Sequence, residues 1–164
     1  MRKLLLLLAI PFVFSSCFKD KETECIYTPA SRVAPDEEIV TLRNWLDANG
    51  IVATLHPSGM FYTINSAGTG KTPEVCKTMV VKYVGSLQNG GIFDSNSTGI
   101  TLLLGQLIDG WKYGLPLIKE GGTITLYIPP ALGYGYSDYR DQNGSIRIPA
   151  NSYLIFTIDL LEVN

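Results

Sequence analysis

The side chains of this chain that could form a binding site are mostly aromatic or branched and apolar, and they stand beside glycine, proline or a lone carboxylate. They gather in six short segments between residues 81 and 156. The segments are Val81-Lys82-Tyr83-Val84-Gly85, Gly91-Ile92-Phe93-Asp94-Ser95, Leu107-Ile108-Asp109-Gly110-Trp111, Pro130-Ala131-Leu132-Gly133-Tyr134-Gly135, Ile148-Pro149-Ala150-Asn151 and Leu154-Ile155-Phe156. Together they predict an aromatic-walled pocket, which suits a ligand that is mostly hydrocarbon with one or two carbonyl groups.

Reactive side chains of the common catalytic kinds are scarce. His56 is the only histidine, so one chain cannot form a Ser–His or Cys–His nucleophile pair. Cys25 and Cys76 are far apart and have no closely spaced partner of the kind that metal sites use. We therefore expect neither hydrolase nor metal chemistry, and no cofactor.

The order and spacing of the six segments resemble the FK506-binding-protein (FKBP) family of peptidyl-prolyl cis-trans isomerases. The resemblance runs from about Met60 to Asn164, roughly two thirds of the chain. It implies an enzyme (EC 5.2.1.8) that accelerates X-Pro bond rotation in exported proteins by binding the prolyl segment in an aromatic apolar pocket. A non-catalytic peptide-binding or chaperone lipoprotein with the same pocket is the alternative.

This chemistry explains why the usual catalytic residues are not needed. An X-Pro bond isomerises slowly because rotation removes amide resonance, with a barrier of about 18–20 kcal/mol. No bond is made and no proton must move, so the catalyst need only bind the twisted amide more tightly than the planar one. Twisting reduces the charge separation between nitrogen and oxygen, and a dry apolar site therefore favours it.

The resemblance also assigns roles to individual residues. Trp111 corresponds to the pocket floor under a proline ring, and Tyr134 to the tyrosine that donates a hydrogen bond to a ligand carbonyl. Asp94, Tyr134 and Tyr83 form the expected catalytic group, and Ile108 would also offer its backbone N–H. The expected walls are Tyr83, Phe93, Leu107, Ile108, Ile148 and Phe156.

Several departures from the family pattern concern the rim of the pocket. The loop over 95–99 is shorter than in many family members and lacks the basic residue that often pairs with the aspartate. The stretch over 105–107 is about two residues shorter than its counterpart in the family. The loop over 135–147 is longer, and Arg147 stands where relatives often have a branched residue. Binding of FK506- or rapamycin-like macrolides is implied by the resemblance, but these changes bear directly on its strength.

The N-terminus predicts export and a lipid anchor. Arg2 and Lys3 precede an apolar run over 4–14 and the small residues before Cys17, as in a lipoprotein signal peptide. Lipidation at Cys17 would hold the protein on a membrane; an ordinary cleaved signal with an incidental cysteine is the alternative. We expect a lipid-anchored protein of the Gram-negative cell envelope, in the outer membrane and facing either the periplasm or the cell surface.

The rest of the chain divides around this anchor. We predict a signal peptide over 1–16, a lipidated cysteine and tether over 17–34, a helical extension over 35–59 and the isomerase-like domain over 60–164. Without Arg2 and Lys3 the chain has 11 basic and 15 acidic residues, and no basic stripe that would favour nucleic acid. Cys25 and Cys76 then form an even pair, either bonded as a disulfide or as two thiols.

Periodicity predicts the elements that position the pocket. Pro35 and the acidic residues after it begin a helix that Asn49-Gly50 ends, and its Trp45 stripe packs on the main domain or, alternatively, on a partner. Strand-like segments lie at 51–55, 60–65, 75–87, from 92, 101–104, 123–128 and 152–163, with a short helix in 107–117 and a polar loop at 134–147. The predicted fold is α+β: a curved antiparallel sheet of about five or six strands wrapped over one short helix, with an extra N-terminal helix.

Overall fold

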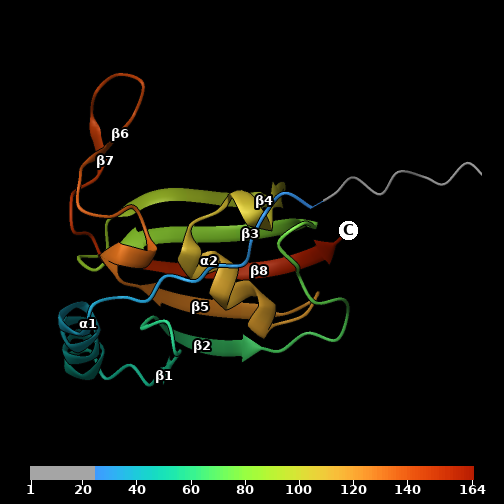
Figure 1. The fold of residues 1–164 in the computed structure, drawn as a ribbon, viewed down its shortest axis with the longest axis horizontal. Coiled ribbons are helices and arrows are strands. Elements are labelled where there is room, and N and C mark those ends of the chain that lie inside the picture. The colour runs from blue at the N-terminus through green and yellow to red at the C-terminus, as the bar shows by residue number, and fades with distance from the viewer. Residues whose placement is uncertain (1–24) are drawn as a thin grey trace, which may run out of the picture.

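The computed structural model describes residues 25–164, so the expected signal peptide and Cys17 lie outside the described residues. No helix within 25–164 is long and apolar enough to cross a bilayer. The framework is a six-stranded antiparallel sheet with strand order β1-β2-β5-β8-β3-β4 (Figure 1). Its strands are β1 (Thr54–Leu55), β2 (Phe61–Ser66), β3 (Thr78–Leu87), β4 (Ile92–Leu103), β5 (Thr123–Ile128) and β8 (Leu154–Val163).

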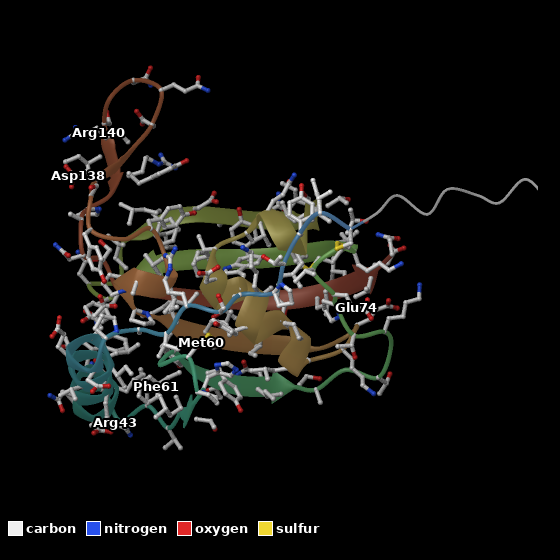
Figure 2. All side chains as sticks on the ribbon, viewed as in Figure 1. Arg43, Met60, Phe61, Glu74, Asp138 and Arg140 are labelled. Atoms are coloured by element: carbon white, nitrogen blue, oxygen red, sulfur yellow. A yellow bond between two sulfur atoms is a disulfide. The ribbon has the colours of Figure 1, made fainter. Side chains whose placement is uncertain are left out.

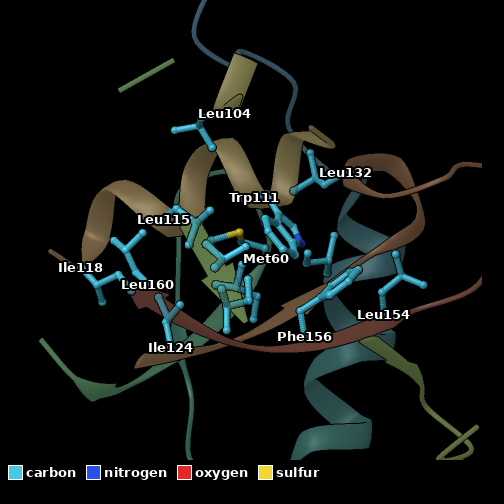
Figure 3. Close-up of a cluster of buried hydrophobic side chains, with 14 of the residues drawn as sticks. Met60, Leu104, Trp111, Leu115, Ile118, Ile124, Leu132, Leu154, Phe156 and Leu160 are labelled. Atoms are coloured by element: carbon cyan, nitrogen blue, oxygen red, sulfur yellow. The ribbon is translucent and has the colours of Figure 1, made fainter. Parts of the chain in front are cut away.

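One face of this sheet packs against a short helix, α2 (Asp109–Gly114), as Figure 1 shows. Three single 3₁₀ turns, η1 (Leu104–Gln106), η2 (Leu115–Leu117) and η3 (Pro130–Leu132), lie before and after the helix in the chain. Alternate residues of the strands point towards it and form the main core (Figure 3); they include Met79, Val81, Ile124, Leu126, Ile128, Phe156, Ile158 and Leu160. The predicted α+β fold, a sheet wrapped over one short helix, is confirmed.

Two glycines allow α2 to lie very close to β5. A Cβ atom added at Gly110 would come 2.5 Å from the side chain of Ile128, and one added at Gly114 would collide with Leu126. Any larger residue at either position would push the helix away from the sheet. These glycines therefore set the distance between α2 and the sheet. That distance also sets how far the α2 side chains, Trp111 among them, lie from the strands.

The N-terminal helix, α1 (Asp36–Ala48), covers part of the opposite face of the sheet. Leu42 and Leu46 are buried against a cross-strand row that contains Phe61, Tyr127 and Ile155, one residue from each of β2, β5 and β8. Trp45 joins this cluster with its ring 6.5 Å from that of Tyr127. The apolar stripe of the helix thus packs on the sheet of its own chain.

Residues 25–35 connect to α1 along the α2 side of the sheet. The Tyr113 hydroxyl donates to the carbonyl of Arg32 at 2.8 Å, and the Gln106 amide donates to the Tyr27 hydroxyl at 2.8 Å. At the start of this segment Cys25 forms a disulfide with Cys76, with Cα atoms 5.7 Å apart. Residues 25–35 are therefore fixed to the domain along their length.

The structure corrects the prediction of separate strands at 92–94 and 101–104. One strand, β4, spans both, and its pairing with β3 shifts between Val81–Ile100 and Tyr83–Asn96. Residues 97–99 lie opposite the single residue Lys82 at this bulge, where the Asn96 side chain accepts the Gly99 N–H at 2.7 Å and Gly99 has φ +105°. Turn-forming residues here produce a bulge inside the strand instead of ending it.

The predicted polar loop over 134–147 also contains structure. A two-stranded hairpin, β6 (Tyr139–Arg140) and β7 (Ile146–Ile148), projects from the sheet, with Asp138 and Arg140 upon it (Figure 2). The Asp141 carboxylate accepts the N–H groups of Asn143 and Ser145 at 2.9 and 3.0 Å and so closes the turn. Composition alone predicted a loop because the two strands are very short and largely exposed.

We expect the Cys25–Cys76 disulfide to stabilise the folded chain, because it joins positions 51 residues apart. In the chain-entropy model a closed loop of this length contributes about 4 kcal/mol. Denaturant unfolding of the chain from residue 18 should show a lower midpoint with reductant, and the same low midpoint for a double Cys25→Ser, Cys76→Ser variant without it. Equal midpoints for the oxidised and reduced chains would contradict this expectation.

Candidate active site

A cavity of about 280 Å³ lies between α2 and the strands on its side of the sheet. It is lined by Tyr83, Asp94, Leu102, Gln106, Leu107, Ile108, Trp111, Tyr134 and Phe156. Seven of these are among the nine residues that the sequence predicts for the pocket. The remaining two, Phe93 and Ile148, line an adjoining cavity.

Trp111 forms the base of the cavity from the first turn of α2. The side chain is only 4% exposed, yet it lines open space, so the indole is covered on the core side and accessible from the cavity. The rings of Tyr83 and Phe156 meet it nearly edge-on, with centroids at 5.4 and 5.2 Å. Figure 3 shows Trp111 above Phe156 within the buried cluster.

The aromatic contacts continue from Phe156 on β8 across β3 to β4. Phe93 of β4 packs edge-on against Phe156 with ring centroids 5.5 Å apart, and Tyr134 packs edge-on against Phe93 at 6.4 Å. Edge-to-face pairs at these separations are favourable because the positive ring edge meets the negative face of its neighbour. Gly85 of β3 makes room for them, since a Cβ there would lie 2.7 Å from the Phe156 ring.

Asp94 occupies the cavity wall on β4 and is held by two hydrogen bonds. The Tyr83 hydroxyl donates to one carboxylate oxygen at 2.6 Å, and the Ser95 N–H donates to the other at 2.9 Å. Residues 95–99, which follow Asp94, contain no basic side chain. In this chain a tyrosine hydroxyl and a backbone amide orient the carboxylate instead.

Tyr83 stays protonated at neutral pH. Burial, and then the hydrogen bond to Asp94 and the negative charge of that carboxylate, raise the pKa of Tyr83 well above its ordinary value. Burial, followed by the nearby Tyr139 and Asp94, also raises the pKa of Tyr134. Both phenols are therefore hydrogen-bond donors, and neither serves as a base.

Two residues that line the cavity carry hydrogen-bond donors without a protein acceptor among residues 25–164. Tyr134 is 40% exposed, and its hydroxyl has no hydrogen-bond partner in the described part of the chain. Ile108 immediately precedes α2, and its N–H likewise lacks a protein acceptor among residues 25–164. A helix N-terminus leaves such amides unsatisfied. The cavity thus combines an apolar base with two donors suited to carbonyl oxygens.

The adjoining cavity, of about 350 Å³, extends the site beneath the β6–β7 hairpin. It shares Asp94 and Tyr134 with the first and adds Phe93, Tyr139, Arg140, Asp141, Gln142, Arg147 and Ile148. Arg147 donates to the carbonyl of Phe93 at 2.9 Å and so fastens the base of the hairpin to β4. Phe93 and Ile148, predicted as walls of the first cavity, therefore line its extension.

The sequence prediction missed Leu102 and Gln106 as lining residues. Leu102 lies on a predicted strand, but the bulge in β4 resets which residues face the cavity, and alternation alone could not show that. Gln106 lies in the stretch 105–107, for which the sequence indicated only a difference in length. Its side chain donates to the hydroxyl of Tyr27, which is 79 positions away. A contact of that range leaves no local signal in the sequence.

Comparison with known proteins gives the family. Residues 70–161 match the model for the FKBP-type peptidyl-prolyl cis-trans isomerase domain. The chain is 44% identical over 110 residues to the probable FKBP-type peptidyl-prolyl cis-trans isomerase of Haemophilus influenzae, covering 65% of this chain and 44% of that protein. With Escherichia coli K12 FkpA it shares 40% over 109 residues, 65% of this chain and 38% of the relative. The chain belongs to the FKBP family and spans under half the length of these relatives.

Solved structures agree with this assignment. The crystal structure of Escherichia coli FkpA matches with a TM-score of 0.66 and 33% identity, over 79% of this chain and 60% of that one. The structure of AtFKBP13 matches with a TM-score of 0.63 and 31% identity, over 69% of this chain and 99% of that one.

The raised pKa of Tyr83 predicts a pH dependence of stability. The folded chain binds the phenol proton more tightly than the unfolded chain does, so this contribution is complete below the ordinary tyrosine pKa of about 10 and is lost as pH rises above it. Urea unfolding should show stability falling more steeply with alkaline pH in the wild type than in Tyr83→Phe. Parallel curves for the two proteins would show that the Tyr83–Asp94 contact does not couple to folding.

Proposed function

We propose that this chain is a peptidyl-prolyl cis-trans isomerase that binds X-Pro segments in the cavity above Trp111. The observation that carries the proposal is an aromatic base in a cavity that Tyr134 and Ile108 also line, with no acceptor among residues 25–164 for the Tyr134 hydroxyl or the Ile108 N–H. A proline ring fits the apolar base, and the carbonyls on either side of it can accept from the donors. Family membership supports the same reaction.

The proposed mechanism is preferential binding of the twisted amide. The low-polarity cavity favours the form in which charge separation between nitrogen and oxygen has decreased, and each 1.4 kcal/mol of such preference gives about a tenfold acceleration. Tyr134 and Ile108 hold the flanking carbonyls so that rotation occurs about one bond only. Tyr83 orients Asp94 beside the rotating amide. Phe93, Leu107, Ile148 and Phe156 complete the apolar walls.

Substrates and place of action follow from the expected export of the chain. We propose that residues 1–16 are a signal peptide, that Cys17 is lipidated, and that residues 60–164 act on proline-containing exported chains in the Gram-negative envelope, from an outer-membrane anchor. Residues 17–34 would be the tether and 35–59 the helical extension. The disulfide between Cys25 and Cys76 fits an oxidising compartment. Macrolides related to FK506 would compete for the same cavity.

The test is a refolding reaction limited by prolyl isomerisation, with the chain from residue 18 as catalyst. We expect wild type to accelerate it and Trp111→Ala to lose about tenfold or more of the rate enhancement, because the base under the proline ring is gone. Trp111→Leu keeps more apolar volume than Trp111→Ala and controls for loss of activity through unfolding. It should retain part of the activity.

The second tryptophan provides a matched control. Trp45→Ala removes the same side chain from α1, where it contacts Tyr127 on the opposite face of the sheet. This variant should lose stability but keep its rate enhancement as long as it is folded. Peptide binding without acceleration by wild type would select the non-catalytic binding protein instead. Equal losses in the Trp45 and Trp111 variants would argue against a pocket centred on Trp111.

A further inference from the structure

A buried carboxylate lies outside the region that matches the family model. Glu38, in the first turn of α1, is only 6% exposed, and the family match begins at residue 70. Burying a charge is costly unless hydrogen bonds compensate for it. The positive end of the helix dipole offsets part of the cost, so the remaining partners of this carboxylate indicate what it does.

Both oxygens of Glu38 bond to the segment that carries Tyr134. One accepts the Ala131 N–H at 2.9 Å, and the other accepts the Tyr136 hydroxyl at 2.8 Å. These partners lie three residues before Tyr134 and two residues after it. The Glu38 side chain on α1 therefore binds the segment on both sides of Tyr134.

No side-chain hydrogen bond within residues 25–164 holds Tyr134 itself. Its side chain is substantially exposed, and within the described residues its ring pairs with the aromatic rings of Phe93 and Tyr139, at 6.4 and 5.0 Å. The position of its hydroxyl thus depends on the backbone of its own segment. That backbone turns sharply, with Gly135 at φ +80° and its N–H bonded to the Pro130 carbonyl at 3.0 Å.

Arg32, which precedes α1, holds the same segment through a second contact. Arg32 donates to the Ala131 carbonyl at 2.9 Å, so both sides of that residue's backbone are bonded by residues preceding the family domain. The Arg32 guanidinium also lies 3.7 Å from the carboxylate of Asp109, two residues before Trp111. Residues 32–38 therefore link the Tyr134 segment to the start of α2.

We propose that Glu38 is a positioning residue that sets the Tyr134 hydroxyl over the cavity, so that the N-terminal extension completes the site. The inference rests on the proposed isomerase function for its catalytic consequence. The structural effect does not depend on that function. Removal of the Glu38 carboxylate releases the segment over 130–136, while the sheet and α2 stay folded. Substrate then meets a donor whose position is no longer fixed.

A double-mutant cycle tests the catalytic consequence. Glu38→Ala should lower kcat/KM several-fold, whereas Glu38→Gln should restore most of it because the amide oxygen can accept the Ala131 N–H and the amide nitrogen can donate to the Tyr136 oxygen. Glu37→Ala, on the exposed side of the same turn, should have no effect. In a Tyr134→Phe background, which has no hydroxyl to position, Glu38→Ala should cause no further loss. An equal loss with and without that hydroxyl would overturn the proposal.

Hydrogen exchange of the Ala131 amide gives a readout that does not depend on activity. The amide should exchange slowly in wild type and Glu38→Gln, and much faster in Glu38→Ala, while amides of β8 keep their protection in all three. Unchanged exchange at Ala131 in Glu38→Ala would overturn the positioning role whatever the activity. Faster exchange in a chain that accelerates no prolyl substrate would support the positioning role and refute the isomerase proposal alone.

Discussion

The site depends on how closely α2 approaches the sheet. Gly110 and Gly114 allow the helix to lie against β5, and Trp111, between them, is thereby brought to the rings of β3 and β8. The edge-to-face contacts of Trp111 with Tyr83 and Phe156 belong to the main core and to the cavity wall at once. Stability of the fold and shape of the pocket therefore rest on the same contacts, and the cavity is formed before any ligand arrives.

This origin of the pocket fits a reaction that needs shape and low polarity more than reactive groups. The hydroxyl of Tyr83 is committed to Asp94, and the pKa of both Tyr83 and Tyr134 is raised, so neither phenol is poised to exchange protons near neutral pH. What remains available to a ligand is an aromatic base and donors for carbonyl oxygens. Specificity then depends on the rim, which the β6–β7 hairpin forms in part.

Sequence patterns predicted the sheet, the short helix and most of the cavity lining, because those residues alternate on strands or stand at the start of a helix. The continuous β4 strand was not predicted, since residues 95–99 have the composition of a turn and only pairing with β3 shows that they form a bulge. From the sequence, Glu38 was recognised only as one of several acidic residues at the start of a helix. Its partners are more than 90 positions away, and no local pattern reports such a contact.

The central claim is that the cavity accelerates rotation of an amide without transferring a proton. The most direct measurement is the rate of cis–trans exchange of a prolyl peptide by NMR, with the chain from residue 18, in light and heavy water at matched acidity. We predict equal enzymatic rates in the two solvents, because no proton moves in the transition state. A rate several-fold lower in heavy water would contradict it and assign acid–base chemistry to Asp94 or Tyr134.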